Sequence, residues 1–237
     1  MYQELTAITI TTASIGLFHT LLGPDHYLPF IVLSKARKWS LIKTSWITFL
    51  CGIGHVLSSI VLGVVGIGVG ISIKKLEIFE SVRGDLAAWI LICFGLIYFV
   101  WGLRSAFRKQ PHKHWHAHGD MSMSIHKHPH NTDQLHVHKG NVKKNLTPWI
   151  LFVIFVFGPC EPLIPLLMYP TVKSNIFGLV LVAGVFSLVT IVTMLGVVIF
   201  LFFGADLLPL SKLERYAHAF AGATICLCGL SIQFLGL

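Results

Sequence analysis

Two short stretches of this sequence place chemically active side chains inside segments that are otherwise apolar. Residues 23–26 read Gly-Pro-Asp-His, and residues 158–161 read Gly-Pro-Cys-Glu. Ionisable groups at membrane depth are costly and tend to mark the path of an ion or substrate. Imidazole, thiolate and carboxylate groups together suit a divalent first-row metal such as nickel, cobalt or zinc. We therefore predict a metal path lined by these residues: His19, Asp25, His26, His55, Cys160 and Glu161.

Structural roles would account for the same residues without a metal. His55 could be a hydrogen-bond partner in helix packing, and Asp25 or Glu161 could join a polar cluster with a neighbouring imidazole or a backbone N–H. Cys160 could be a small buried apolar residue. The other cysteines lie among small residues in helices and are predicted to be of that kind: Cys51, Cys93, Cys226 and Cys228. His218 could be a gate residue or an interfacial histidine.

A second chemical signal is the polar segment from residue 111 to residue 138, where histidines alternate with other residues. These histidines are His112, His114, His116, His118, His126, His128, His130, His136 and His138. A polar segment without apolar periodicity cannot bury a core, so we predict that it is disordered. Neutral imidazoles bind divalent nickel, cobalt and zinc, and the segment is therefore predicted to capture metal ions.

The composition indicates which elements must position these side chains. The mean hydropathy is +0.76, and only 12% of residues are charged, which places the chain in a lipid bilayer. About 20 apolar residues suffice for a helix to cross the hydrocarbon core. The predicted spans are about residues 6–33, 44–72, 86–103, 147–171, 175–204 and 214–236. Because no basic region precedes the first span, we expect this span to be retained rather than cleaved.

Each Gly-Pro pair is predicted to break the helix that contains it. Proline lacks a backbone N–H, so the carbonyl four residues earlier loses its hydrogen-bond partner. The carbonyls concerned are those of Thr20 and Phe155. The breaks are predicted at Gly23, Pro24, Gly158 and Pro159.

The Gly-Pro motifs belong to a longer internal repeat. Gly95-Leu96 and Gly102-Leu103, which end the third span, match Gly229-Leu230 and Gly236-Leu237 at the end of the sixth. Three spans per copy imply opposite orientations, so we predict an all-α, polytopic membrane protein with six transmembrane helices in a 3+3 inverted repeat. Its parts are a first three-helix repeat (1–110), a cytoplasmic histidine-rich loop (111–145) and a second three-helix repeat (146–237).

Positive charge predicts the orientation. Most lysines and arginines fall in the loops after the first, third and fifth predicted spans. The positive-inside rule therefore places these loops in the cytoplasm and both termini outside, in a plasma (inner) membrane. The pI of about 9.4 follows from this topology, so nucleic acid is not expected as a partner.

The motifs resemble those of a known transporter family. Residues 19–26 (His-Thr-Leu-Leu-Gly-Pro-Asp-His), the pair Gly54-His55 and residues 158–165 (Gly-Pro-Cys-Glu-Pro-Leu-Ile-Pro) look like the NicO/UreH-like branch of nickel/cobalt transporters. The resemblance implies a transporter of a divalent metal ion. A cytoplasmic histidine-rich loop would concentrate metal on the loading side for export, which favours efflux, and protons could be exchanged for the metal.

A Pro-Cys pair in a broken helix is also similar to CcdA-like thiol–disulfide electron conduits. That chemistry needs two cysteines able to meet. Here the first motif carries Asp25 where the second carries Cys160, so another cysteine would have to be the partner. A metal-sensing membrane protein without transport is a third alternative.

Other classes of function are not expected from this sequence. It contains no nucleotide-binding loop, no glycine-rich phosphate cradle and no large soluble domain, so we expect neither an ATP-driven pump nor an enzyme. Gly52, Gly54 and the glycines of residues 63–70 permit close helix packing, which would allow a homo-oligomer.

Overall fold

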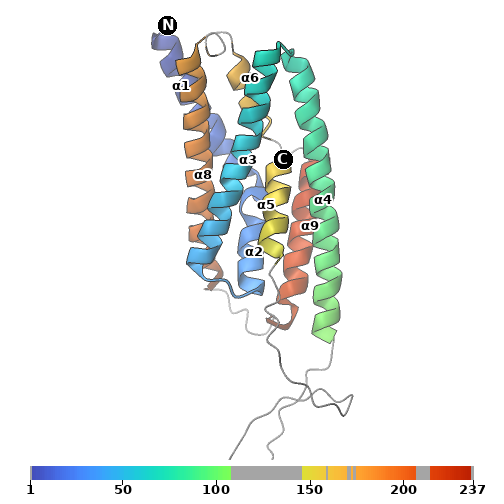
Figure 1. The fold of residues 1–237 in the computed structure, drawn as a ribbon. Coiled ribbons are helices and arrows are strands. Elements are labelled where there is room, and N and C mark those ends of the chain that lie inside the picture. Colours follow the sequence, from blue (N-terminus) through green and yellow to red (C-terminus); the bar gives the residue numbers. More distant parts are fainter. Residues whose placement is uncertain are drawn as a thin grey trace, which may run out of the picture.

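Five helices are long and apolar enough to cross a membrane within the residues that the structure describes, which are 2–107, 146–158, 160–169, 172, 175–206 and 214–235. The structure is a computed structural model. The long helices are α1 (Tyr2–Leu22), α3 (Leu41–Val69), α4 (Ile73–Phe107), α8 (Ile176–Asp206) and α9 (Ala217–Leu235). They run lengthwise through one elongated bundle (Figure 1). The chain is an all-helical, multi-pass membrane protein.

Shorter elements complete the bundle and account for the difference from six predicted spans. They are η1 (Pro24–His26), α2 (Leu28–Ala36), α5 (Thr147–Phe157), α6 (Leu163–Met168) and η3 (Glu214–Tyr216). The fourth predicted span, 147–171, consists of two short helices, α5 and α6, separated by a bend. Neither is long enough to cross the hydrocarbon core alone, because a helix rises only about 1.5 Å per residue.

Local signals set the limits of α3. The hydroxyl of Ser40 accepts a hydrogen bond from the Lys43 N–H at 3.3 Å, which caps the first turn. The helix stops at Gly70, whose φ of 73° lies in the left-handed region that glycine tolerates best. The serine and the glycine are therefore start and stop signals that can be read from the sequence.

Glycines bring α4 and α9 into backbone contact. A Cβ added at Gly95 would meet the backbone of Cys226, and one added at Gly222 would meet the backbone of Phe99. Small residues allow such close approach between helices in a membrane. Gly102 likewise faces the backbone of Ala219, so Gly95 and Gly102 of the predicted repeat help to pack the two helices side by side.

The glycines of α3 are used within the same chain. A Cβ at Gly54 would lie 2.8 Å from Val156 of α5, and one at Gly63 would lie 2.8 Å from Leu167 of α6. These positions hold α3 close to the two short helices. They are therefore explained without a second copy of the chain.

Helix α4 begins well before the third span predicted from hydropathy. Its buried positions follow a spacing of three and four residues, as on one face of a helix: Leu76, Glu80, Gly84, Ala87, Ala88, Leu91, Gly95, Tyr98, Gly102 and Ala106. Glu80 and Arg83 precede the third predicted span, 86–103, because charged residues lower the hydropathy of a window. The structure places both inside this helix.

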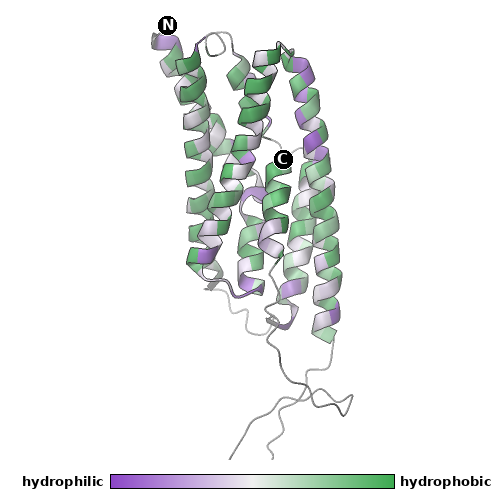
Figure 2. Cartoon of the chain, viewed as in Figure 1, coloured by the Kyte–Doolittle hydropathy of each residue, from purple (hydrophilic) through white to green (hydrophobic). Residues whose placement is uncertain are grey.

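Two apolar clusters form the interior of the bundle. One contains Phe30 and Leu151, and the other contains Val56, Leu163 and Phe186. Hydrophilic residues gather at the ends of the bundle, at the break between α1 and α2, and along the first turns of α4 (Figure 2).

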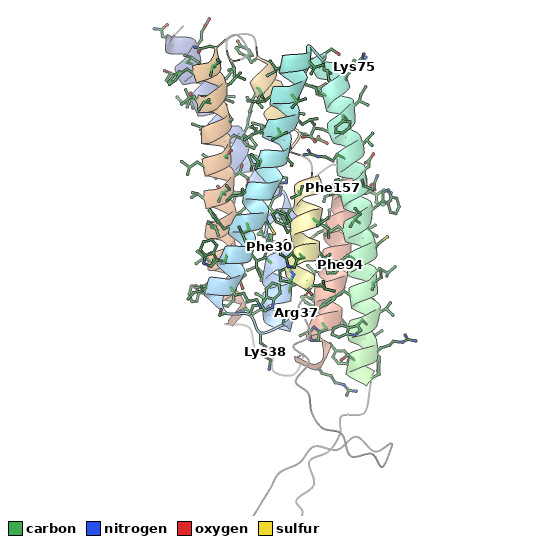
Figure 3. The ribbon with its side chains drawn as sticks, viewed as in Figure 1. Phe30, Arg37, Lys38, Lys75, Phe94 and Phe157 are labelled. Atoms are coloured by element: carbon green, nitrogen blue, oxygen red, sulfur yellow. The ribbon has the colours of Figure 1, made fainter. Side chains whose placement is uncertain are left out.

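Basic side chains lie at both ends of the bundle. Arg37 and Lys38 lie at one end, and Lys75 lies at the other (Figure 3). The described ends of α4 and α8 and the start of α5 are at the same end as Lys38 (Figure 1). Phe157 marks the end of α5 in the middle of the bundle, where the second break lies (Figure 3).

A buried histidine cluster and a buried cysteine at two helix breaks

The first break turns His26 into the bundle. Helix α1 closes with a hydrogen bond from the Gly23 N–H to the His19 carbonyl at 3.1 Å. Pro24 then starts a single 3₁₀ turn, in which the His26 N–H donates to the Gly23 carbonyl at 3.1 Å. Helix α1 thus ends at Leu22, directly before Gly23 and Pro24, and His26 is buried.

Local acceptors orient the His26 ring. Its Nδ1 lies 3.2 Å from Oδ1 of Asp25 and 3.1 Å from the carbonyl oxygen of Gly23. A proton on Nδ1 can be donated to either oxygen, and in that tautomer Nε2 keeps a free lone pair. Carboxylates and carbonyls orient metal-binding histidines in the same way.

Three imidazoles converge at this point. The ring centroids of His19 and His26 are 4.9 Å apart, and those of His26 and His55 are 5.1 Å apart. One nitrogen from each ring can be chosen so that all three lie within 4.8 Å of one another. The structure thus brings together His19 from α1, His26 from η1 and His55 from α3.

Several nitrogens of this cluster are buried and make no hydrogen bond with the described residues. They are Nε2 of His19, Nε2 of His26, and both Nδ1 and Nε2 of His55. Buried polar groups are normally paired, so an unpaired set that faces a common point calls for a ligand. Three imidazole nitrogens could hold a metal ion and leave one coordination position open.

Aromatic side chains enclose the three histidines. The ring of Phe186 lies 6.4 Å from that of His19, and the ring of Phe155 lies 6.2 Å from that of His55. Phe186 is fully buried and Phe155 is 6% exposed. An apolar shell of this kind limits the access of water to the imidazoles.

The second break has its own hydrogen-bond arrangement. The Gly158 N–H donates to the Phe155 carbonyl at 3.1 Å, so the prediction that this carbonyl is free is wrong. The last turn of α5 is tighter than an α-helical turn, so the N–H of Gly158 donates to this carbonyl in place of the N–H that Pro159 lacks. Pro162 has no N–H to donate to the Gly158 carbonyl four residues earlier. Nη2 of Arg83 donates a hydrogen bond to that oxygen instead, at 3.0 Å.

Glycine is required at both breaks for space rather than for backbone conformation. Gly23 has φ −83° and Gly158 has φ −59°, values that other residues adopt readily. A Cβ at Gly23 would lie 2.5 Å from Nδ1 of His26, and one at Gly158 would lie 3.1 Å from Nδ1 of His55. Each glycine thus makes room for an imidazole.

Helix α4 carries a buried ion pair that the sequence motifs did not indicate. Glu80 is 1% exposed, and its Oε2 lies 2.9 Å from Nε of Arg83. This N–H does not point at Oε2, so the contact is an ion pair, whereas Nη2 of Arg83 does donate to Oε1 of Glu80 at 3.1 Å. Nη2 also donates to the hydroxyl of Ser59 on α3 at 2.6 Å. The 3/4 spacing of the buried face of α4 is the sequence signal that would have found the pair.

Cys160 lies just after the second break and is fully buried. It packs in the cluster that contains Val56 and Leu163, whereas Cys51 and Cys228 are buried in the other cluster. All the cysteines of the chain are free. Cys93, predicted to be buried, is exposed on the outside of α4.

The remaining predicted site residues are spread more widely. Glu161 is exposed, and the Asp25 side chain is 21% exposed beside His26. His218 lies away from the breaks, where its Nδ1 is 2.9 Å from the Tyr98 hydroxyl. Pro159 and the histidines of residues 111–138 lie outside the described residues.

Comparison with protein-family models shows which family has this architecture. The model described as the transmembrane region of cytochrome c biogenesis proteins matches residues 28–231, which is most of the chain. The chain belongs to this family. The part that matches the cytochrome c biogenesis family includes His55, the Glu80–Arg83 pair and Cys160, but it begins after His19 and His26. Neither the comparison with curated proteins nor that with solved structures found a match.

The family match corrects the assignment to the NicO/UreH-like nickel/cobalt transporters. That assignment is wrong, and the expectation of nickel or cobalt efflux falls with it. The reason is physical. Gly-Pro motifs report a broken helix, and a broken helix is a backbone feature that membrane proteins use for more than one kind of chemistry. The motifs therefore do not by themselves identify the family.

Proposed function

We propose that this protein carries reducing equivalents across a membrane by thiol–disulfide exchange, with Cys160 as the exchanging thiol. Membership of the cytochrome c biogenesis family and the place of Cys160 support the proposal. The cysteine lies at a helix break inside the bundle, within the part of the chain that matches the family. Breaks of this kind form the working sites of membrane carriers.

One sulfur is enough for the transfer if it is reached from each side in turn. The Cys160 thiolate attacks the disulfide of an acceptor protein, so that the acceptor's S–S bond breaks, a mixed disulfide forms and one acceptor thiolate leaves. A donor dithiol on the other side attacks the sulfur of Cys160, which releases the acceptor's second thiolate. The donor's second thiol then displaces Cys160. The donor ends as a disulfide, the acceptor as a dithiol, and Cys160 is regenerated.

The packing favours this one-sulfur route over an internal disulfide. Cys51 and Cys228 lie in a different apolar cluster from Cys160, and the first motif has Asp25 at the corresponding position. Because Cys160 is fully buried, exchange requires the bend between α5 and α6 to open toward one face at a time.

An inverted repeat would provide such alternating access. The pair α1–α2 and the pair α5–α6 are each broken at a Gly-Pro motif, and the glycine-rich helices α4 and α9 lie against each other. We place the end of the bundle with Arg37 and Lys38 in the cytoplasm of a plasma (inner) membrane, as the positive-inside rule implies, and both termini outside.

Vesicles containing the purified protein test this function. Reduced glutathione is supplied outside, and a membrane-impermeant aromatic disulfide is trapped inside, where its reduction releases a coloured thiolate. We expect colour with the wild-type protein and with Cys93→Ser, whose cysteine is exposed, and background colour with Cys160→Ser. Normal transfer by Cys160→Ser would exclude the proposal. Loss of transfer in Cys51→Ser or Cys228→Ser would show an internal partner instead of the one-sulfur route.

A second candidate function is the binding of a divalent transition metal as a resident ion. The observation that favours it is the set of unpaired nitrogens of His19, His26 and His55. Nickel, cobalt and zinc are the divalent ions that suit imidazole ligands. Such an ion would join α1, η1 and α3 and so hold the first break in place.

The metal site can be tested without measuring thiol transfer. Cobalt bound by imidazoles absorbs visible light, so the purified chain is titrated with cobalt in the presence of a competing chelator. The histidines of residues 111–138 are also predicted to bind cobalt, and the chelator serves to restrict the signal to the tightest site. We expect His55→Gln to remove this signal and His218→Gln to keep it. Equal signals from both variants would exclude the site.

A further inference from the structure

Glu80 is a carboxylate buried inside a membrane helix, and neither function proposed above assigns it a role. Its side chain is 1% exposed. Charged residues in such positions are costly and are commonly retained for a function. Arg83 neutralises one side of it, while Oε2 has no aligned hydrogen-bond donor among the described residues.

The pair lies against the break that carries Cys160. Nη2 of Arg83 donates to the Gly158 carbonyl, two residues before the cysteine, at 3.0 Å. The same Nη2 group donates to Oε1 of Glu80 at 3.1 Å and to the hydroxyl of Ser59 at 2.6 Å, so the carboxylate is held beside this break. Helix α4 therefore presents a carboxylate to the segment that holds the thiol.

The chemistry of exchange requires a proton acceptor at this place. Only the thiolate attacks a disulfide, so Cys160 must first lose its proton. The charged groups that act on its sulfur are Glu80, Arg83 and Asp25. Arg83 is a cation and cannot take a proton. Asp25 is engaged by the imidazole of His26 at 3.2 Å. Glu80 is the remaining group, a carboxylate that is 1% exposed and whose Oε2 has no aligned hydrogen-bond donor among the described residues, which suits it to the task.

We propose that Glu80 is the proton acceptor of Cys160, an assignment that rests on the proposed thiol exchange. As the sulfur attacks a disulfide, its proton passes to Oε2 of Glu80. When the donor's second thiol later displaces Cys160, the cysteine leaves as a thiolate and takes the proton back. Before the attack and after the proton has returned to the cysteine, Arg83 pairs with the ionised carboxylate, and its contacts fix the position of Glu80 relative to the break.

The rate of alkylation of Cys160 by N-ethylmaleimide tests this role in the full chain. Cys93 is exposed in the same molecule and is the internal reference for each measurement. The matched control is Glu77→Gln, because Glu77 is exposed one turn earlier on the same helix. We expect Glu80→Gln to slow the alkylation of Cys160 about 100-fold at neutral pH, the scale of general-base effects, with a deficit that shrinks as the pH rises. Glu80→Asp, which keeps a shorter carboxylate, should fall between the two.

The alternative outcomes differ in sign. If Glu80 only balanced the charge of Arg83, Glu80→Gln would leave a lone cation beside the thiol, and alkylation would become faster. A faster or unchanged rate in Glu80→Gln, or an unchanged rate in Glu80→Asp if the former does not fold, would overturn the assignment. The test is separate from the proposed function. Slow alkylation in Glu80→Gln with normal electron transfer in Cys160→Ser would mean that thiol exchange, and not the proton acceptor, is wrong.

Discussion

Replacing Arg83 by glutamine should destabilise the fold more than any other single change in a charged residue of α4. The Nη2 group of Arg83 donates to acceptors on three elements, namely Oε1 of Glu80, the hydroxyl of Ser59 on α3 and the carbonyl of Gly158 at the end of α5. The Arg83 side chain is 11% exposed, so water cannot replace it well. The substitution leaves the carboxylate of Glu80 buried and without its counter-ion.

The magnitude follows from that unpaired charge. Removing one partner of a buried ion pair costs about 3–5 kcal/mol of unfolding free energy. For a chain of this size, each kcal/mol corresponds to about 2–4 °C in melting temperature, so the expected loss is about 6–20 °C. The Ser59 and Gly158 contacts belong to the same network, and their contributions are not added separately because neighbouring interactions are not independent.

The assay is thermal unfolding of the purified protein in one detergent, followed by circular dichroism. Lys75→Gln is the control, because Lys75 is exposed near the start of the same helix and should melt within about 1 °C of the wild type. The double variant Glu80→Gln/Arg83→Gln should recover most of the loss, since neither charge is then left alone. A single variant that melts like the wild type, or a double variant no better than the single, would refute a buried pair that bridges α3, α4 and α5.

Two further predictions concern the packing of α9. Gly222→Ala should lower the free energy of unfolding by about 1–3 kcal/mol, because its Cβ would meet the backbone of Phe99. The control Gly196→Ala adds a Cβ in open space on α8 and should be neutral or stabilising. Equal melting temperatures of the two variants would contradict the close approach of α4 and α9. Tyr98→Phe removes the hydroxyl that Arg37 and His218 contact and should cost about 1–3 kcal/mol, while Tyr169→Phe, at an exposed tyrosine, should not change the melting temperature measurably.

Local chemistry made the helix breaks predictable. Proline lacks an N–H wherever it stands, so Gly-Pro inside an apolar segment interrupts a helix whatever surrounds it. The breaks after Leu22 and Phe157 follow from this property. The consequences for individual carbonyls were less predictable. The Phe155 oxygen accepts a hydrogen bond from the Gly158 N–H, and the Gly158 oxygen accepts one from Arg83 on α4.

The histidine cluster was only partly predictable. His19 and His26 are seven residues apart on either side of one break, so their proximity is largely a local matter. His55 joins them from α3, far beyond the break in the sequence, so its place depends on tertiary packing. Residue type therefore indicated His19, His26 and His55 as candidate ligands, but it could not separate these buried or partly buried side chains from Glu161, which is exposed.

Glu80 and Arg83 show the limit of hydropathy as a guide. A charged residue lowers the mean hydropathy of its window whichever way it faces, so the start of α4 read as a loop. The partners that keep this pair buried come from Ser59 and Gly158, which are distant in the sequence. Burial of a charge depends on such partners, and partners are supplied by packing.

The sequence by itself determined that the chain crosses a membrane several times and where its helices break, because hydropathy and the missing N–H of proline are properties of short segments. It also carried the family, since the match to the cytochrome c biogenesis family extends over most of the chain, although the short motifs pointed elsewhere. Only the tertiary structure decided which side chains meet: the three imidazoles in one cluster, Cys160 apart from the other cysteines, and the Glu80–Arg83 pair at its side. Those meetings depend on how closely α3, α4 and α5 approach one another, and that distance is set by glycines and polar partners on different helices rather than by any one segment.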